Sequence, residues 1–190
     1  LFDLCAARPE PIPFFGELGS VNPMFLLPQA LAGRGEAIAQ GWAGSLTMGA
    51  GQFCTNPGIA VAVDGPALQD FVATASAALE PVGAQTMLTD GIAEAYRSGR
   101  DRVRGAAGVR EVLTTTCDRR NATPYLYSTT GRDWLANEAL GEEVFGPLGL
   151  VVAAEGFEEM VEIAKSLHGQ LTCTLHMDEG DAEEARKLMP

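Results

Sequence analysis

Residues 29–63 read QALAGRGEAIAQGWAGSLTMGAGQFCTNPGIAVAV, and the pattern of this stretch decides the fold class. Apolar residues recur at helical spacing in its first half, which predicts a long helix over about residues 29–48. Gly49 and Gly51 are expected to end that helix. The β-branched run over residues 58–63 then predicts a buried strand. The stretch is therefore a helix, a glycine-rich turn and a strand.

The same alternation extends outward over the whole chain. Further strands are expected at residues 12–18, 112–116, 124–129, 148–153 and 170–176. Further helices are expected at about residues 1–7, 67–79, 91–98, 132–139, 157–167 and from 181 onward. Residues 24–27 form an apolar stretch between two prolines. Strands separated by helices predict an α/β fold with an open, largely parallel sheet flanked by helices.

Composition excludes several classes of protein. The 190 residues are 46% hydrophobic and 20% charged, which is too apolar for a disordered chain. The net charge of −12 and the absence of a basic cluster argue against nucleic-acid binding. No apolar run is long enough to cross a bilayer, so no membrane partner is expected. The four cysteines show no paired spacing, which favours reduced thiols and a cytoplasmic location, and no metal site is assigned.

Cys54 is the first candidate for chemistry. It lies in Gly49-Ala50-Gly51-Gln52-Phe53-Cys54-Thr55-Asn56-Pro57-Gly58, a glycine-rich turn that follows the long helix. Glycine allows close backbone approach, so a thiol here could be exposed with N–H groups nearby to hold an oxyanion. The alternative is that Cys54 is a small buried hydrophobic residue, as free cysteines commonly are.

Acidic residues provide the other two candidates. Glu17 ends an apolar run and is followed by Leu18 and Gly19; burial there would raise its pKa and suit it to general-base work. The alternative is an ordinary solvated acid. The segment Glu142-Glu143-Val144-Phe145-Gly146-Pro147 could likewise serve a site, cap a helix or face solvent.

Together the three segments resemble the aldehyde dehydrogenase superfamily in content, order and approximate spacing. In that family a Glu-Leu-Gly segment supplies the general base, a Gly-Gln-x-Cys segment the nucleophile and a Glu-x-Phe-Gly-Pro segment a cofactor contact. The resemblance thus implies that Cys54 is the nucleophile and Glu17 the base. It implies that Glu143 binds the nicotinamide ribose, that Phe145 positions the ring and that the backbone of Leu18 contacts the nicotinamide.

The implied reaction is oxidation of an aldehyde to the carboxylic acid through a thiohemiacetal and a thioester on Cys54. The cofactor is expected to be NADP, ahead of NAD, with most of its binding site outside this chain. Ser20-Val21-Asn22-Pro23 and Thr55-Asn56-Pro57-Gly58 depart from the commonest family pattern. Both variants look like the branch that oxidises 2-oxoglutarate semialdehyde, so a small semialdehyde is the expected substrate.

The resemblance also implies a domain division. Residues 1–19 are expected to be the tail of the cofactor-binding domain, and residues 20–190 the catalytic domain, truncated at its C-terminal end. We expect the complete protein to be a homo-oligomer and this chain alone to be inactive. Two rival functions remain open: a cysteine-dependent thioester hydrolase or acyltransferase, which would usually need a histidine base, and a non-catalytic binding domain of the same fold.

Overall fold

The computed structural model describes residues 1–188, and its strands form one large sheet and one small ribbon. The strands are β1 (Met24–Leu26), β2 (Ile59–Val63), β3 (Gln85–Thr86), β4 (Arg110–Leu113), β5 (Asn121–Ala122), β6 (Tyr125–Thr130), β7 (Leu148–Ala154) and β8 (Thr174–His176). The large sheet has the order β4-β6-β7-β2-β1-β8. Its neighbours are parallel except for β4, which runs antiparallel to β6. β3 and β5 pair antiparallel in the separate ribbon.

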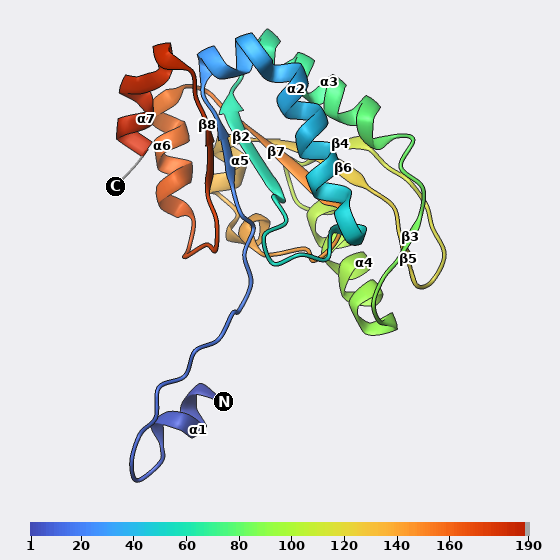
Figure 1. The fold of residues 1–190 in the computed structure, drawn as a ribbon, viewed down its shortest axis with the longest axis vertical. Helices are drawn as coiled ribbons and strands as arrows, with labels where there is room; N and C mark the ends of the chain where they lie inside the picture. The colour runs from blue at the N-terminus through green and yellow to red at the C-terminus, as the bar shows by residue number, and fades with distance from the viewer. Residues whose placement is uncertain (189–190) are drawn as a thin grey trace.

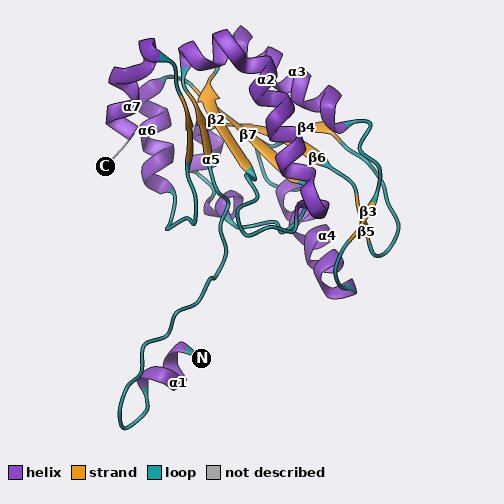
Figure 2. Ribbon diagram, viewed as in Figure 1, coloured by secondary structure: helices purple, strands orange, loops and turns teal. Residues whose placement is uncertain are grey.

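Helices cover both faces of this sheet (Figure 1, Figure 2). They are α2 (Pro28–Thr47), α3 (Pro66–Leu79), α4 (Asp90–Arg104), α5 (Gly131–Leu135), α6 (Phe157–Ser166) and α7 (Ala182–Leu188), whereas α1 (Phe2–Ala6) lies away from the sheet. α2 and α3 pack on one face, and α4, α5 and α6 contribute to the core on the other. The predicted fold class, an open and largely parallel sheet flanked by helices, is therefore confirmed.

Side-chain alternation along β2 separates the two cores. Ile59 and Val61 point into the core that contains α4 and α6, whereas Ala60 and Ala62 face α2 and α3. The small alanines leave room on that second face for Trp42 of α2, which donates a hydrogen bond from its indole nitrogen to the carbonyl of Pro57 at 2.6 Å. Trp42 thus fixes the long helix to the loop that leads into β2.

Several element boundaries differ from the sequence prediction. Residues 12–18 form no strand, because no neighbouring strand pairs with them. Residues 24–26, between the prolines, are instead a strand in the sheet interior. The last strand begins only at Thr174, and the helix expected over residues 91–98 extends from Asp90 to Arg104. The helix expected over residues 132–139 is the shorter α5, followed by a 3₁₀ turn over Glu138–Gly141.

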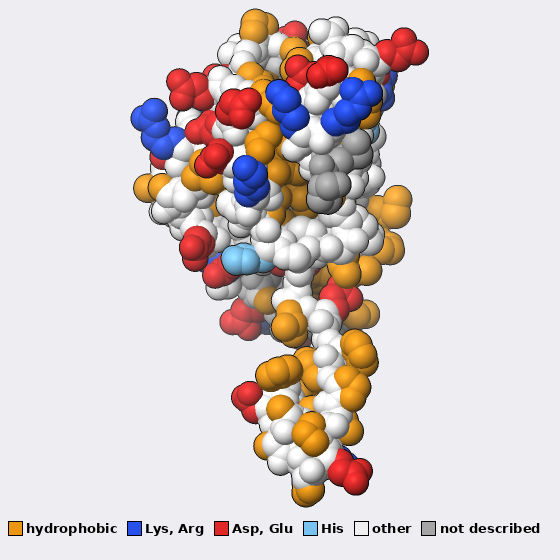
Figure 3. Space-filling model, turned by 90° about the vertical axis from the view of Figure 1, so that its left-hand side faces the viewer, with side chains coloured by type: hydrophobic (Ala, Val, Ile, Leu, Met, Phe, Trp, Pro, Cys, Tyr) orange, Lys and Arg blue, Asp and Glu red, His pale blue; other side chains and the backbone are white. Residues whose placement is uncertain are grey.

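Residues 1–19 project away from the body as an extended arm (Figure 1). Apolar side chains are exposed along this arm, with Phe15 at 91% and Leu18 at 89% (Figure 3). Burial begins abruptly at Ser20, which is only 4% exposed. This change coincides with the predicted division at residues 19 and 20, although the assignment of the arm to a cofactor domain stays a prediction. None of the helices in residues 1–188 has the length and apolarity needed to span a bilayer.

A buried carboxylate far along the chain caps the long helix. Asp181 is 1% exposed and accepts hydrogen bonds from the backbone N–H groups of Gln29 and Ala30 at 2.8 and 2.9 Å. These donors belong to the first turn of α2, where backbone N–H groups have no partner within the helix. A negative charge there is also favoured by the helix dipole. Asp181 therefore joins the C-terminal part of the chain to the start of α2.

We predict that Asp181→Ala lowers the free energy of unfolding by roughly 2 to 3 kcal/mol, because it leaves buried donors without an acceptor. Urea unfolding of the purified chain measures this change. Glu183→Ala is the matched control, since this exposed acid only pairs with Arg186 at the surface, and it should change stability by less than about 0.5 kcal/mol. Equal losses in the two variants would contradict the capping role.

Candidate active site

Cys54 lies on a loop that begins with a left-handed turn. Directly after α2, Gly49, Ala50 and Gly51 all have positive φ, at 55°, 59° and 66°. Ala50 is the unusual member, because a side chain disfavours this region, and it is also 1% exposed. The surrounding contacts must therefore hold the turn in place.

Two glutamines supply those contacts. Gln85 accepts a hydrogen bond from the N–H of Ala50 at 2.8 Å and donates to the carbonyl of Thr47 at 3.0 Å. Gln52 donates to the carbonyl of Gly49 at 3.0 Å and accepts from the N–H of Leu88 at 2.8 Å. The backbone between helix and cysteine is thus clamped from both sides.

The cysteine loop packs directly against the loop that precedes β7. A Cβ added at Gly51 would overlap the backbone of Gly146, and a Cβ added at Gly146 would overlap the ring of Tyr96. The hydroxyl of Tyr96 donates to the carbonyl of Thr123 at 2.9 Å and reaches that of Pro147 at 3.3 Å. Glycine is thus required at both positions by close approach as well as by positive φ.

Cys54 itself is exposed. The alternative that it is a buried hydrophobic residue is therefore wrong. Its backbone N–H bonds to no acceptor within residues 1–188, so it remains free to stabilise an oxyanion in the way the sequence suggested. Its carbonyl, by contrast, accepts a hydrogen bond from the side chain of Asn22 at 2.9 Å.

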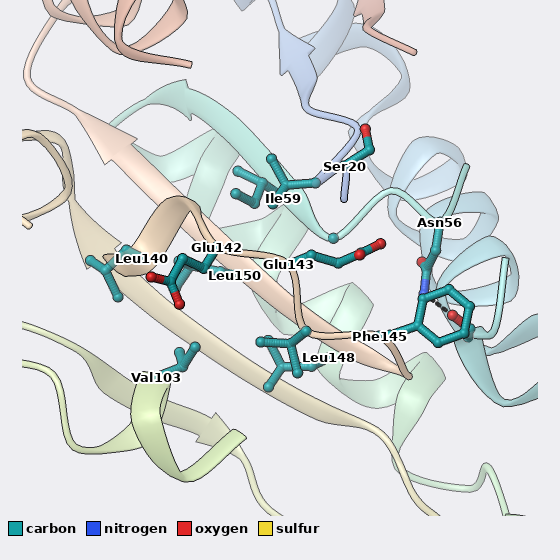
Figure 4. Close-up of a pocket in the computed structure, with 14 residues that line it drawn as sticks. Ser20, Asn56, Ile59, Val103, Leu140, Glu142, Glu143, Phe145, Leu148 and Leu150 are labelled. Atoms are coloured by element: carbon teal, nitrogen blue, oxygen red, sulfur yellow. Dashed lines mark hydrogen bonds between the residues drawn. The ribbon is translucent and has the colours of Figure 1, made fainter. Parts of the chain in front are cut away.

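Asn56 links the cysteine loop to the Glu143 segment. Its Nδ2 donates to the carbonyls of Gly51 at 2.7 Å and Gly146 at 3.0 Å, while its Oδ1 is buried without a partner in residues 1–188. Asn56 lines a cavity of about 30 Å³, shown in Figure 4. That volume suits one or two water molecules and is far below a typical ligand pocket. A substrate would therefore bind over this cavity rather than within it.

The structure separates the roles of the two adjacent acids. The Glu142 side chain is exposed and pairs with Arg102 at 3.0 Å, so it fits the surface alternative. Glu143 points the other way, toward the segments that carry Ser20 and Asn56 (Figure 4). Its carboxylate lies beside Gly19 and the backbone N–H of Ser20. Both acids line the cavity, but only Glu143 faces the segments of Ser20 and Asn56.

Partial burial raises the pKa of Glu143 above its ordinary value of 4.5. The nearby N–H of Ser20 opposes this shift, and the charge of Glu17 adds to it. Glu143 also has no ion-pair partner in residues 1–188. A half-buried carboxylate without a cation is an acceptor available for ligand hydroxyl groups, which fits a ribose.

The remaining predicted site residues lie around this centre. Phe145 is half-buried and lines the same cavity. Glu17 and Leu18 lie on the exposed arm, so the burial expected for Glu17 is wrong: no strand or helix covers that segment. The charge of Glu17 nevertheless contributes to the raised pKa of Glu143, after the larger effect of burial. The structure thus brings Glu143, Phe145 and the cysteine loop together and leaves Glu17 at their edge.

Sequence reasoning missed the polar residues that hold the loops together. Asn22 was noted only as part of a departure from a family pattern, and Gln52 only as part of a motif. Gln85 and Gln170 were not singled out. No spacing could have revealed them, because their partners lie far away in the chain: Gln170 accepts hydrogen bonds from Ser20, Val21 and Asn22, about 150 residues earlier.

Comparison with known proteins places the chain in a family. It is 46% identical over its whole length to alpha-ketoglutaric semialdehyde dehydrogenase 2 of Azospirillum brasilense, and 36% identical to an alpha-ketoglutaric semialdehyde dehydrogenase of Acinetobacter baylyi. It covers 37% and 36% of those proteins, so it spans little more than a third of their length. No family model matches the chain.

Solved structures share the fold. An NADP-dependent glyceraldehyde-3-phosphate dehydrogenase of Bacillus halodurans, in complex with NADP, matches 90% of this chain with a TM-score of 0.75 at 16% identity. An NAD-dependent benzaldehyde dehydrogenase of Corynebacterium glutamicum matches 90% with a TM-score of 0.73 at 20% identity. The chain covers 37% and 38% of these structures. The chain belongs to the aldehyde dehydrogenase superfamily, and the resemblance drawn from its motifs is confirmed. Within that superfamily, its curated relatives are semialdehyde dehydrogenases.

We predict that Gly146→Ala destabilises the chain by roughly 2 kcal/mol or more, because the new methyl group would overlap the Tyr96 ring and the residue would keep a positive φ. The control is Gly156→Ala, where nothing lies within 4 Å of the new methyl group and φ is −170°. Urea unfolding compares the two. Similar stabilities would show that the two loops can separate at little cost.

A second prediction concerns pH. Because the pKa of Glu143 is raised in the folded state, the native chain holds more protons there than the unfolded chain, and stability falls as pH rises through the interval above 4.5. Glu143→Gln removes this penalty, so its stability relative to wild type should be higher at pH 7 than at pH 4. Urea unfolding at both pH values tests this. Glu142→Gln, which loses only a surface ion pair, should not reproduce the trend.

Proposed function

We propose that this chain carries the nucleophile and the nicotinamide-facing edge of an NAD(P)-dependent aldehyde dehydrogenase. The observation that carries the proposal is the exposed Cys54, with a free backbone N–H, on a loop fixed against the segment that bears Glu143. The substrate we propose is a semialdehyde such as 2-oxoglutarate semialdehyde. The names of the two curated relatives support this choice.

Cys54 begins the proposed reaction as a thiolate that attacks the aldehyde carbon, which forms a C–S bond and leaves the negative charge on oxygen. The Cys54 N–H stabilises that oxyanion. A nicotinamide held by the Glu143 segment would supply the oxidation as a hydride acceptor, and Cys54 would then carry the acyl group as a thioester. Glu17 then takes a proton from water as the water attacks the thioester, and the C–S bond breaks to give the acid and the thiolate.

Residues of the Glu143 segment would hold the nicotinamide end of the cofactor. The unpaired, half-buried Glu143 carboxylate fits the two hydroxyls of a ribose, and the partly exposed ring of Phe145 offers an apolar surface for the nicotinamide. The backbone of Leu18, on the arm next to Glu17, is the third proposed contact. NADP ahead of NAD remains our proposal; relatives of the same fold are described in complex with either NAD or NADP.

The rival hydrolase would need a histidine base beside Cys54. His176 pairs in register with Leu26, which itself pairs with Ala62, so it lies at the carboxyl end of strands whose amino ends receive the cysteine loop. Burial and the nearby Arg34 also lower its pKa. Neither His168 nor His176 makes a side-chain hydrogen bond to Cys54 within residues 1–188. No observation favours this second function.

In the complete enzyme, Cys54→Ser should abolish aldehyde oxidation. Glu17→Gln should retain a burst of reduced cofactor but lower steady-state turnover by about a hundredfold or more, because the thioester forms and then hydrolyses slowly. Stopped-flow absorbance of the reduced cofactor separates the two phases. Glu10→Gln, an exposed acid on the same arm, is the control and should behave as wild type. Undiminished steady-state turnover of Glu17→Gln would remove Glu17 from the mechanism.

A further inference from the structure

Asn22 occupies an unusual position for a polar residue. It is 2% exposed, and its φ of +46° is one that few residues other than glycine and asparagine adopt. Only Pro23 separates it from β1, an interior strand that pairs with both β2 and β8. Its side chain therefore reaches the loops that enter both neighbouring strands.

Both the oxygen and the nitrogen of the Asn22 side-chain amide make hydrogen bonds. Oδ1 accepts from the Ser20 hydroxyl at 2.8 Å and from the backbone N–H and hydroxyl of Thr172 at 3.2 and 3.0 Å. Nδ2 donates to the carbonyls of Cys54 and Asn56, both at 2.9 Å. Because Oδ1 faces a backbone donor and Nδ2 faces two backbone carbonyls, only one orientation of the amide satisfies all five partners.

The backbone of Asn22 is fixed as well. Oε1 of Gln170 accepts hydrogen bonds from the N–H groups of Val21 and Asn22 at 2.7 and 3.1 Å and from the Ser20 hydroxyl at 2.9 Å. Asn22 is therefore anchored to the loop before β8, and its two donors are aimed from that anchor at the cysteine loop.

We propose that Asn22 is a positioning residue for the nucleophile, an assignment that rests on the proposed role of Cys54. By holding the carbonyls of Cys54 and Asn56, Asn22 fixes the peptide planes on the C-terminal side of the cysteine. The direction of the thiol and of the free Cys54 N–H is set by this backbone, which no regular helix or strand supports. Small errors in such geometry are costly to a reaction between fixed groups.

The test measures the rate at which iodoacetamide labels each cysteine of the purified chain, read by peptide mass spectrometry. Cys5 lies on the N-terminal arm, outside the hydrogen-bond network of Asn22, and serves as the internal reference. Asn22→Asp keeps the acceptor oxygen but replaces both donors to the cysteine loop with a second oxygen. We expect labelling of Cys54 relative to Cys5 to fall about tenfold at pH 7, because the cysteine loop loses both donors that fix its carbonyls. The added negative charge should also move the pH profile upward, because it disfavours the thiolate.

Thr172→Val is the matched control. It removes one hydrogen bond to Oδ1 on the side away from Cys54, so it should leave labelling of Cys54 unchanged even where urea unfolding shows a loss of stability. Asn22→Gly is measured alongside Asn22→Asp, because glycine suits the positive φ and removes the same donors without adding a charge; it also serves if Asn22→Asp fails to fold by circular dichroism. A slower Cys54 in that variant is then the expected result.

The outcomes separate the two proposals. If Cys54 of the wild-type chain reacts no faster than Cys5, the proposed nucleophile is wrong whatever the variants do. If wild-type Cys54 reacts faster and the Asn22 variant keeps that rate, Cys54 stands but Asn22 does not position it. An equal slowing by Thr172→Val would show that the network acts through overall stability, which also overturns the positioning role.

Discussion

Parallel pairing of β7, β2 and β1 is the constraint on which the site depends. Each of the three functional segments directly precedes one of these strands: Glu17 to Asn22 precede β1, Cys54 and Asn56 precede β2, and Glu143 to Gly146 precede β7. Since the strands are adjacent and parallel, their amino ends meet at one edge of the sheet. Segments more than a hundred residues apart in sequence are thereby brought into contact.

Close packing at this edge then decides which residues are permitted. A Cβ at Gly51 would overlap the backbone of Gly146, and a Cβ at Gly146 would overlap the Tyr96 ring, whose hydroxyl also reaches the carbonyl of Pro147. Trp42 fixes the other end of the cysteine loop through Pro57. The exposed thiol is thus carried by a loop that is anchored at its start, its middle and its end, which is how a loop without regular structure can hold a reactive group in one place.

β2 and β7 are continuous apolar runs, as strands buried on both faces of a sheet usually are. For that reason the class of fold could be predicted from the sequence. The sequence did not predict β1, since three residues between prolines give no periodicity. Residues 12–18 carried the same apolar signal but have no partner strand, and pattern alone cannot supply one. The candidates Cys54 and Glu143 were found through motifs, and the structure separated Glu143 from Glu142 by direction. The structural roles of Asn22 and Gln170 were not predicted, because hydrogen bonds between residues about 150 positions apart produce no local sequence pattern.

The side chains that hold the loops at this edge of the sheet are mostly neutral amides. In many open α/β sheets the ligand lies at the carboxyl ends of the strands, where helix N-termini supply N–H groups. Here the proposed nucleophile, Cys54, lies at the amino ends, and side chains hold the loops instead. Five neutral amide side chains perform that task, those of Asn22, Gln52, Asn56, Gln85 and Gln170. Four of them both donate and accept, whereas Asn56 only donates within residues 1–188. A charged residue in any of these places would act on a thiolate and on a developing oxyanion through a medium that screens poorly. Amides fix the backbone without that interference, so the charge that matters at this edge is left to Cys54 and to the carboxylates of Glu143 and Glu17.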